Sequence, residues 1–145
     1  MATTANARIT RRDSDKGSIP VAATKVLPAN GLVFRTDTGF ATDVIASGAN
    51  PFMGIAEKMA DNSAGAAGDI NVEVWREGQF LLPFTGATLT QADIGKNVYA
   101  TDNNVLTLTE ENRSFVGVMT EFVTATSAYV DIVVGRRGPQ GEPGA

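Results

Sequence analysis

The stretch Val33-Phe34-Arg35-Thr36-Asp37 has a counterpart 65 residues later, Val98-Tyr99-Ala100-Thr101-Asp102. Two further pairs follow in the same order: Phe52-Met53-Gly54-Ile55 with Phe115-Val116-Gly117-Val118, and Val72-Glu73-Val74 with Val130-Asp131-Ile132. The three offsets are 65, 63 and 58 residues, so the changes in length fall between the motifs, where loops vary at little cost. The matches predict a duplicated β-unit, with residues 31–78 and 96–134 as its related halves.

Short runs of β-branched and aromatic residues, separated by Gly, Asn, Asp and Thr, continue along the chain from Ile19. This pattern is typical of strands joined by turns. Strands are expected over residues 32–36, 40–45, 52–59, 70–76, 80–84, 97–101, 105–109, 115–122 and 128–134. Their spacing of about ten residues predicts an all-β fold, a small barrel or sandwich built from two similar β-units. The one helical signal is a capping pair at residues 90–93, which allows about a single turn.

The composition excludes several classes of function. The chain has 145 residues, with no cysteine and no histidine, so the common general base and the usual zinc ligands are missing. Residues 19–135 carry six basic and thirteen acidic side chains, which argues against direct nucleic-acid binding. No apolar run approaches the roughly 20 residues that span a bilayer. The expectation is a protein that is not an enzyme, with no cofactor, no metal and no membrane partner.

Individual residues of the body offer no clear chemical site. Asp37 and Asp102 occupy matching turns, where an aspartate commonly bonds the nearby backbone. The single tryptophan, Trp75, is interpreted either as an interface anchor or as the large residue that closes one end of a barrel. Residues 60–69 are nearly all small and are expected to form a flexible surface loop.

Both ends of the chain differ from the body, which is expected over residues 19–134. Residues 1–18 lack apolar periodicity and carry Arg8, Arg11, Arg12 and Lys16, so they are interpreted as a basic docking arm, or else as an unstructured end without a role. Residues 135–145 form a collagen-like tail, with glycine at every third position: Gly135, Gly138, Gly141 and Gly144. That period has a physical meaning where three chains share an axis, which predicts a homotrimer. The alternative is a Gly/Pro-rich tail without order.

The second half of the chain resembles the head-decoration, or capsid cement, proteins of tailed bacteriophages. The resemblance rests on the family's recurring elements, which match Gly78-x-Phe80-x-Leu82-Pro83, Leu89-Thr90, Asp93-Ile94-Gly95-Lys96-x-Val98-Tyr99, Asp102-Asn103-Asn104, Val116-Gly117-Val118 and Val130-x-Ile132. It covers residues 77–134 well and residues 30–76 more loosely.

The resemblance implies a β-barrel-like body that assembles as trimers on the outer surface of a phage capsid and stabilises the head. The expected partners are the major capsid protein and further copies of the chain, and the expected location is the virion surface after synthesis in the host cytoplasm. The alternative is a receptor- or glycan-binding module of a phage fibre or of a cell-surface collagen-like protein.

Overall fold

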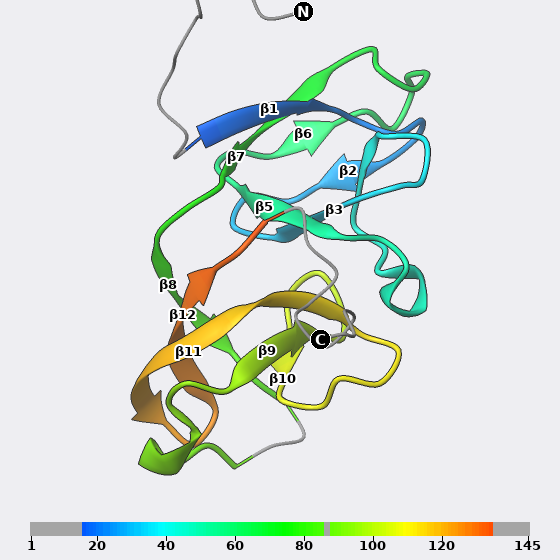
Figure 1. The fold of residues 1–145 in the computed structure, drawn as a ribbon. Helices are drawn as coiled ribbons and strands as arrows, with labels where there is room; N and C mark the ends of the chain where they lie inside the picture. Colours follow the sequence, from blue (N-terminus) through cyan, green and yellow to red (C-terminus); the bar gives the residue numbers. More distant parts are fainter. Residues whose placement is uncertain (1–15, 86–87, 135–145) are drawn as a thin grey trace, which may run out of the picture.

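The computed structural model describes residues 16–85 and 88–134, which form short strands and two 3-10 turns (Figure 1). Every strand range expected from the sequence overlaps a strand of the structure, and the all-β fold is confirmed. The elements are β1 Lys16–Pro20, β2 Val26–Leu27, β3 Leu32–Arg35, β4 Ala41–Thr42, η1 Ala46–Gly48, β5 Phe52–Ala56, β6 Ala60–Asp61, β7 Asn71–Trp75, β8 Gln79–Pro83, η2 Gln91–Asp93, β9 Asn97–Ala100, β10 Leu106–Thr107, β11 Ser114–Thr124 and β12 Ser127–Ile132.

The two halves of the chain form two five-stranded sheets with the same strand order. The first sheet has the order β1-β7-β5-β3-β4, and the second, read from its opposite edge, has the order β8-β12-β11-β9-β10. Each strand therefore has a counterpart at the same place in the other sheet, in agreement with the duplication expected from the sequence. We refer to β1–β7 as the first unit and to β8–β12 as the second unit. Figure 1 shows the first unit above the second.

Each sheet curls until its two outer strands meet. Val21, just after β1, forms a parallel bridge with Ala41 of β4, and Phe84, just after β8, forms a parallel bridge with Leu106 of β10. The next residue donates its backbone N–H in both units, from Ala22 to Ala41 at 2.9 Å and from Thr85 to Leu106 at 3.0 Å. The same contact thus closes both units into small barrels.

A glycine at the same place in each unit bends the central strand. The register of β5 against β3 shifts beside Gly54, and the register of β11 against β9 shifts beside Gly117. A Cβ atom on Gly54 would lie 2.5 Å from the carbonyl oxygen of Trp75, and one on Gly117 would overlap the carbonyl oxygen of Asp131. Glycine is required at both places because a neighbouring strand crosses too closely for any side chain.

The buried side chains form two clusters, one confined to the first unit and one that extends over both units. One cluster lies within the first unit and includes Val21, Leu27, Val72 and Val74. The other fills the second unit and also contains side chains of the first unit, namely Leu32, Phe34, Phe52 and Ile55. The two units therefore share a continuous apolar core across their contact.

In the structure the body begins at Lys16 rather than at the expected Ile19. Residues 16–18 were expected in the docking arm, but they lie in β1, where Lys16 pairs with Trp75 and Ile19 with Val72. Ile19 and Val21 are the only large aliphatic residues among residues 16–21, so the alternation was too short to indicate a strand. Its pairing with β7 supplies the backbone hydrogen bonds that hold it.

Residues 60–69 form a mostly exposed surface segment, as expected, and it is organised around one buried amide. The Asn62 side chain is 3% exposed, and its amide nitrogen donates to the carbonyl oxygens of Ala22 and Ala66, both at 3.0 Å. A Cβ atom on Gly65 would overlap the Asn62 side chain. The small residues of this segment therefore allow a tight wrap around Asn62, which composition alone does not reveal.

The expected helical turn is present as η2. The Thr90 side chain meets the backbone at Asp93, and the Asp93 carboxylate accepts a bond from the Thr90 backbone N–H at 2.9 Å. The reciprocal pair satisfies donors that a short helix leaves unpaired at its start.

Candidate functional site

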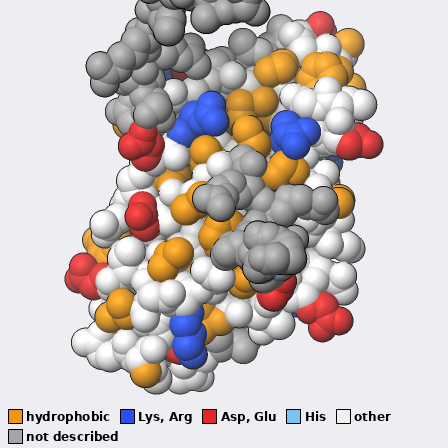
Figure 2. Space-filling model, viewed as in Figure 1, with side chains coloured by type: hydrophobic (Ala, Val, Ile, Leu, Met, Phe, Trp, Pro, Cys, Tyr) orange, Lys and Arg blue, Asp and Glu red, His pale blue; other side chains and the backbone are white. Residues whose placement is uncertain are grey.

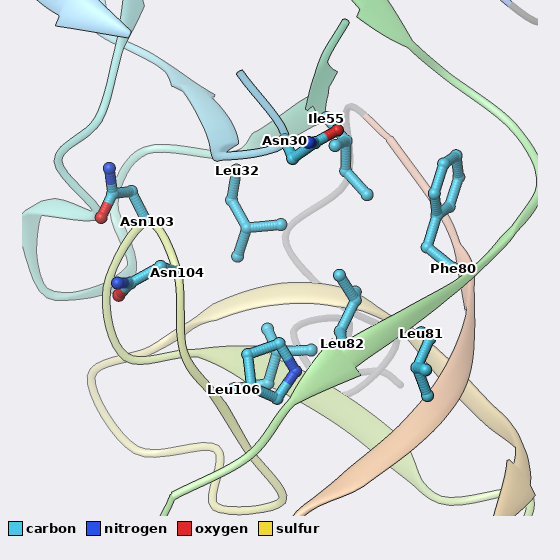
Figure 3. Close-up of a pocket in the computed structure, with 10 residues that line it drawn as sticks. Asn30, Leu32, Ile55, Phe80, Leu81, Leu82, Asn103, Asn104 and Leu106 are labelled. Atoms are coloured by element: carbon cyan, nitrogen blue, oxygen red, sulfur yellow. The ribbon is translucent and has the colours of Figure 1, made fainter. Parts of the chain in front are cut away.

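A cavity of about 330 Å³ lies along the seam between the two units (Figure 3). Its walls are mainly aliphatic, with asparagine side chains and one aromatic ring at the margins. The lining residues are Asn30, Leu32, Ile55, Phe80, Leu81, Leu82, Pro83, Asn103, Asn104 and Leu106. In Figure 3, Leu32 and Ile55 of the first unit face Leu82 and Leu106 of the second across the cavity. It is the candidate site because it combines apolar walls with polar groups at its rim.

Polar contacts between the units fix the shape of the seam. The Leu32 backbone N–H donates to the Asn103 carbonyl oxygen at 2.7 Å. On another part of the seam, the buried Ser114 hydroxyl donates to the Asn50 carbonyl oxygen at 2.8 Å. Together with the shared core, these bonds hold the cavity walls in place.

One wall of the cavity is an edge strand with outward-facing backbone groups. Phe84 donates its N–H to Thr126 at 2.9 Å, and Ile132 donates to Gly78 at 3.1 Å. Because bonded and non-bonded pairs alternate in an antiparallel ladder, Phe80 and Leu82 bond to β12. The N–H and C=O groups of Gln79 and Leu81 therefore point away from β12. Within the described part of the chain, no strand pairs with Gln79 or Leu81 on that edge, and β10 meets it only beyond the end of β8, at Phe84 and Thr85.

The side chains of β8 alternate in the way that an edge strand of a barrel requires. Leu82 is buried, whereas Leu81 is 50% exposed. Pro83 lies at the end of the strand, where its missing N–H costs no ladder bond to β12. The strand therefore presents both an apolar surface and unpaired backbone groups to the cavity.

The start of β1 lies in one cross-strand row with the cavity wall. Leu32 pairs with Ile55, Ile55 with Trp75, and Trp75 with Lys16, so the four side chains share one face of the sheet. Neighbouring strands are about 4.8 Å apart, which places the Lys16 backbone about 10 Å from that of Ile55. The arm thus joins the body two strands away from the cavity.

The Trp75 ring lies against Lys16, the first basic side chain of the body. The Lys16 ammonium lies 4.5 Å from the centre of the Trp75 ring and 3.1 Å from the Glu57 carboxylate. Trp75 is half-buried and belongs to the sheet face that also contributes Ile55. Its ring therefore acts as a platform for the segment where the arm enters β1.

The acidic side chains do not converge on a reactive site. Asp37 and Asp102 are both exposed, and the Asp102 carboxylate accepts a bond from the Asn103 backbone N–H at 2.7 Å, as an aspartate in a turn does. Within residues 16–85 and 88–134, no group of three or more metal-ligating side chains is gathered in one place. In the same residues, no helix is long and apolar enough to cross a membrane.

The perturbed pKa values have structural causes. The hydrogen bond from Lys96 lowers the pKa of Asp93, and the bond from the Thr90 backbone adds to this effect. Hydrogen bonds from Ser63 lower the pKa of Asp61. Burial raises the pKa of Tyr99, against a smaller opposite effect of Asn97. None of these groups lines the cavity.

Most of the site residues expected from the sequence lie outside the described residues. This applies to Arg8, Arg11 and Arg12 and to the four glycines of the tail, Gly135, Gly138, Gly141 and Gly144. Lys16 is the one that the structure places. The sequence analysis did not single out the β8 edge or the three asparagines of the cavity rim. One sequence signal could have indicated that β1 and β8 are equivalent strands: Ile19-Pro20-Val21 matches Leu82-Pro83-Phe84 at an offset of 63 residues.

The surface outside the cavity is mixed in character. Figure 2 shows acidic side chains mainly toward the margins of one face, with hydrophobic side chains distributed between polar ones and few basic groups. The exposed large hydrophobic residues are Val26, Val44, Met59, Leu81, Ile94 and Val123. Of these, only Leu81 lines the cavity.

Comparison of the chain with models of known protein families, with curated proteins and with solved structures found no match.

Proposed function

We propose that this protein is a structural virion component that binds the outside of a phage capsid and stabilises the head. The observation that supports it best is the apolar core that the two barrel units share, because it joins them into one body. A cement protein needs such a body, because it must hold its shape while it bridges other subunits. The sequence resemblance supports the same function.

In this proposal the basic arm makes the main contact with the major capsid protein. Arg8, Arg11 and Arg12 precede a body in which acidic side chains outnumber basic ones. The arm can therefore bind acidic or carbonyl-rich surface that the body itself would repel. Because salt screens exposed charges over a Debye length of about 8 Å at physiological strength, added salt should weaken attachment in part.

The collagen-like tail completes the proposal of a homotrimer. Four glycines at every third position are suited to three chains that meet at one axis. Eleven residues at about 3.1 Å each reach only some 35 Å, so the bodies must bring the tails together. The trimer is expected at least when the protein is assembled on its partner. Sedimentation or the structure of the assembled protein tests this step, and dimers or three tails that point apart would contradict it.

The decisive experiment is attachment to purified heads that lack the protein. The full chain should decorate these heads and raise the temperature at which they release DNA. The variant Arg11→Gln/Arg12→Gln should bind more weakly, whereas Lys58→Gln/Arg76→Gln removes the same charge from the body and should bind normally. Equal binding by the two double variants would contradict the role of the arm, and no binding by the full chain would contradict the function.

One observation favours a ligand-binding module as the second candidate. The cavity has the half-buried Phe80 ring in its wall and Asn30, Asn103 and Asn104 at its rim, and a mainly apolar pocket with a few polar groups is the usual form of a small-ligand site. Binding to an array of oligosaccharides, lost in Asn104→Ala, would support this candidate. Attachment to heads without any such binding would favour the structural role.

A further inference from the structure

The cavity and the β8 edge together form a receptor for one more extended segment. The outward N–H and C=O groups of Gln79 and Leu81 can bond a neighbouring strand, and an unpaired edge of this kind is the usual site of strand addition. Beside it, Leu32, Ile55 and Leu106 form an apolar recess across the seam. A segment on this edge would place one side chain in the recess.

We propose that residues 7–11 of the arm lie along the β8 edge of their own body, with the Ile9 side chain in the cavity. The described chain begins at Lys16, in the same cross-strand row as Ile55 and Leu32. Six residues lie between Ile9 and Lys16, so the two are at most about 25 Å apart along an extended chain. The row places the start of β1 about 10 Å from Ile55 in the cavity wall, which is well within that span.

The sequence of the arm fits this site at one position. Ile9 is the only large apolar residue between Met1 and Lys16, and Thr10 beside it is β-branched. Residues 1–15 contain neither proline nor glycine, the residues that most weaken a strand. The segment can therefore be extended and still bring one branched aliphatic side chain to an aliphatic recess.

Charge favours the same placement. Successive side chains of a strand alternate between its faces, so Arg8 and Thr10 lie opposite to Ile9, on the outer face of the sheet. On that face Asp131 of β12 is exposed and pairs with Gln79 of β8. Arg8 on the added strand would lie two strands from Asp131, within reach of its long side chain.

This inference does not depend on the proposed function, because it concerns the isolated protein. It adds to that function a reason for efficient attachment. An arm that is already extended on the body loses less conformational entropy on binding than one without order. Arg8 would be presented to a partner surface in a fixed position, whereas Arg11 lies on the Ile9 face of the strand, at its end.

Trypsin cleavage after Arg8, Arg11 and Arg12 tests the proposal on the full chain. Ile9→Asp places a charge in the apolar recess and should accelerate this cleavage at least about tenfold, because a docked segment must open before it is cut. Thr4→Asp adds the same charge elsewhere in the arm and should leave the rate unchanged, and Ile9→Val should retain the protection. Equal rates in the wild type and Ile9→Asp would overturn the proposal.

Methyl NMR gives an independent measurement. The Ile9 methyl groups should show contacts with those of Leu32 and Leu106, and the Leu81 amide should exchange more slowly than in Ile9→Asp. Contacts of Ile9 with any other part of the body would overturn the proposal. Contacts that appear only between differently labelled copies would overturn the placement of the arm on its own body.

Discussion

Replacement of Gly54 by alanine tests the close crossing that bends each barrel. Two effects add at this residue. Its φ of +142° is rarely adopted by residues with a side chain, which costs about 1–2 kcal/mol. In addition, the new Cβ atom would lie 2.5 Å from the Trp75 carbonyl oxygen, and overpacking of this kind costs about 1–3 kcal/mol. The free energy of unfolding should therefore fall by about 2–5 kcal/mol.

The chain supplies matched controls for this measurement. Gly39 and Gly95 also have positive φ angles, of +97° and +93°, but an added Cβ would meet nothing within 4 Å. Gly39→Ala and Gly95→Ala should therefore cost only the backbone part, about 1–2 kcal/mol. Urea unfolding of the three variants gives the free energies by linear extrapolation. If Gly54→Ala cost no more than the controls, the close crossing would not be what requires glycine.

Three further predictions concern single polar groups. The bond with Lys96 lowers the pKa of Asp93, so this bond stabilises the fold above about pH 4 and the contribution is lost as the pH falls through the lowered pKa. Asp93→Asn should therefore lower the stability at pH 7 and make the stability less sensitive to acid. Thermal unfolding across pH measures both effects. Asn62→Ala removes the amide bonds to the Ala22 and Ala66 carbonyl oxygens, which keep backbone donors from Lys25 and Asp69, and should cost about 1–3 kcal/mol in urea unfolding; an unchanged midpoint would show that the amide bonds do not contribute to stability. Ser114→Ala removes the bond to Asn50 across the seam and should cost about 1–2 kcal/mol, with a single unfolding transition retained; two separate transitions would contradict a shared core.

The repeated motifs made the duplicated fold predictable, because the residues that define it lie in the repeat. Phe52 and Phe115 occupy the same place in β5 and β11, and their ring partners Phe34 and Tyr99 match as well, at centroid distances of 6.0 and 5.8 Å. Because the same packing occurs in both units, similar residue types recur at matching positions of the sequence. The strand order within each sheet was not predicted, because it depends on pairings between strands that are distant in the sequence.

The candidate site could not be predicted in the same way. Leu32 and Ile55 come from the first unit and Leu106 from the second, and no local pattern reveals that these side chains meet. β1 was missed because its register depends on β7, more than fifty residues later. Asn62 was missed because a polar residue among small ones is typical of a loop, and only tertiary contacts determine that it is buried.

The two ends of the described body lie beside the same short connection. Lys16 pairs with Trp75 at the end of β7, and Ile132 donates to Gly78 just before β8. Only Arg76 and Glu77 lie between Trp75 and Gly78, a span of at most about 10 Å. A pulling force between the arm and the tail would therefore act across this connection, while both barrels would stay largely outside the path of the load. If the arm is anchored to a shell and the tail to its two neighbours, internal pressure in the head would strain the link between the units before it strained either barrel.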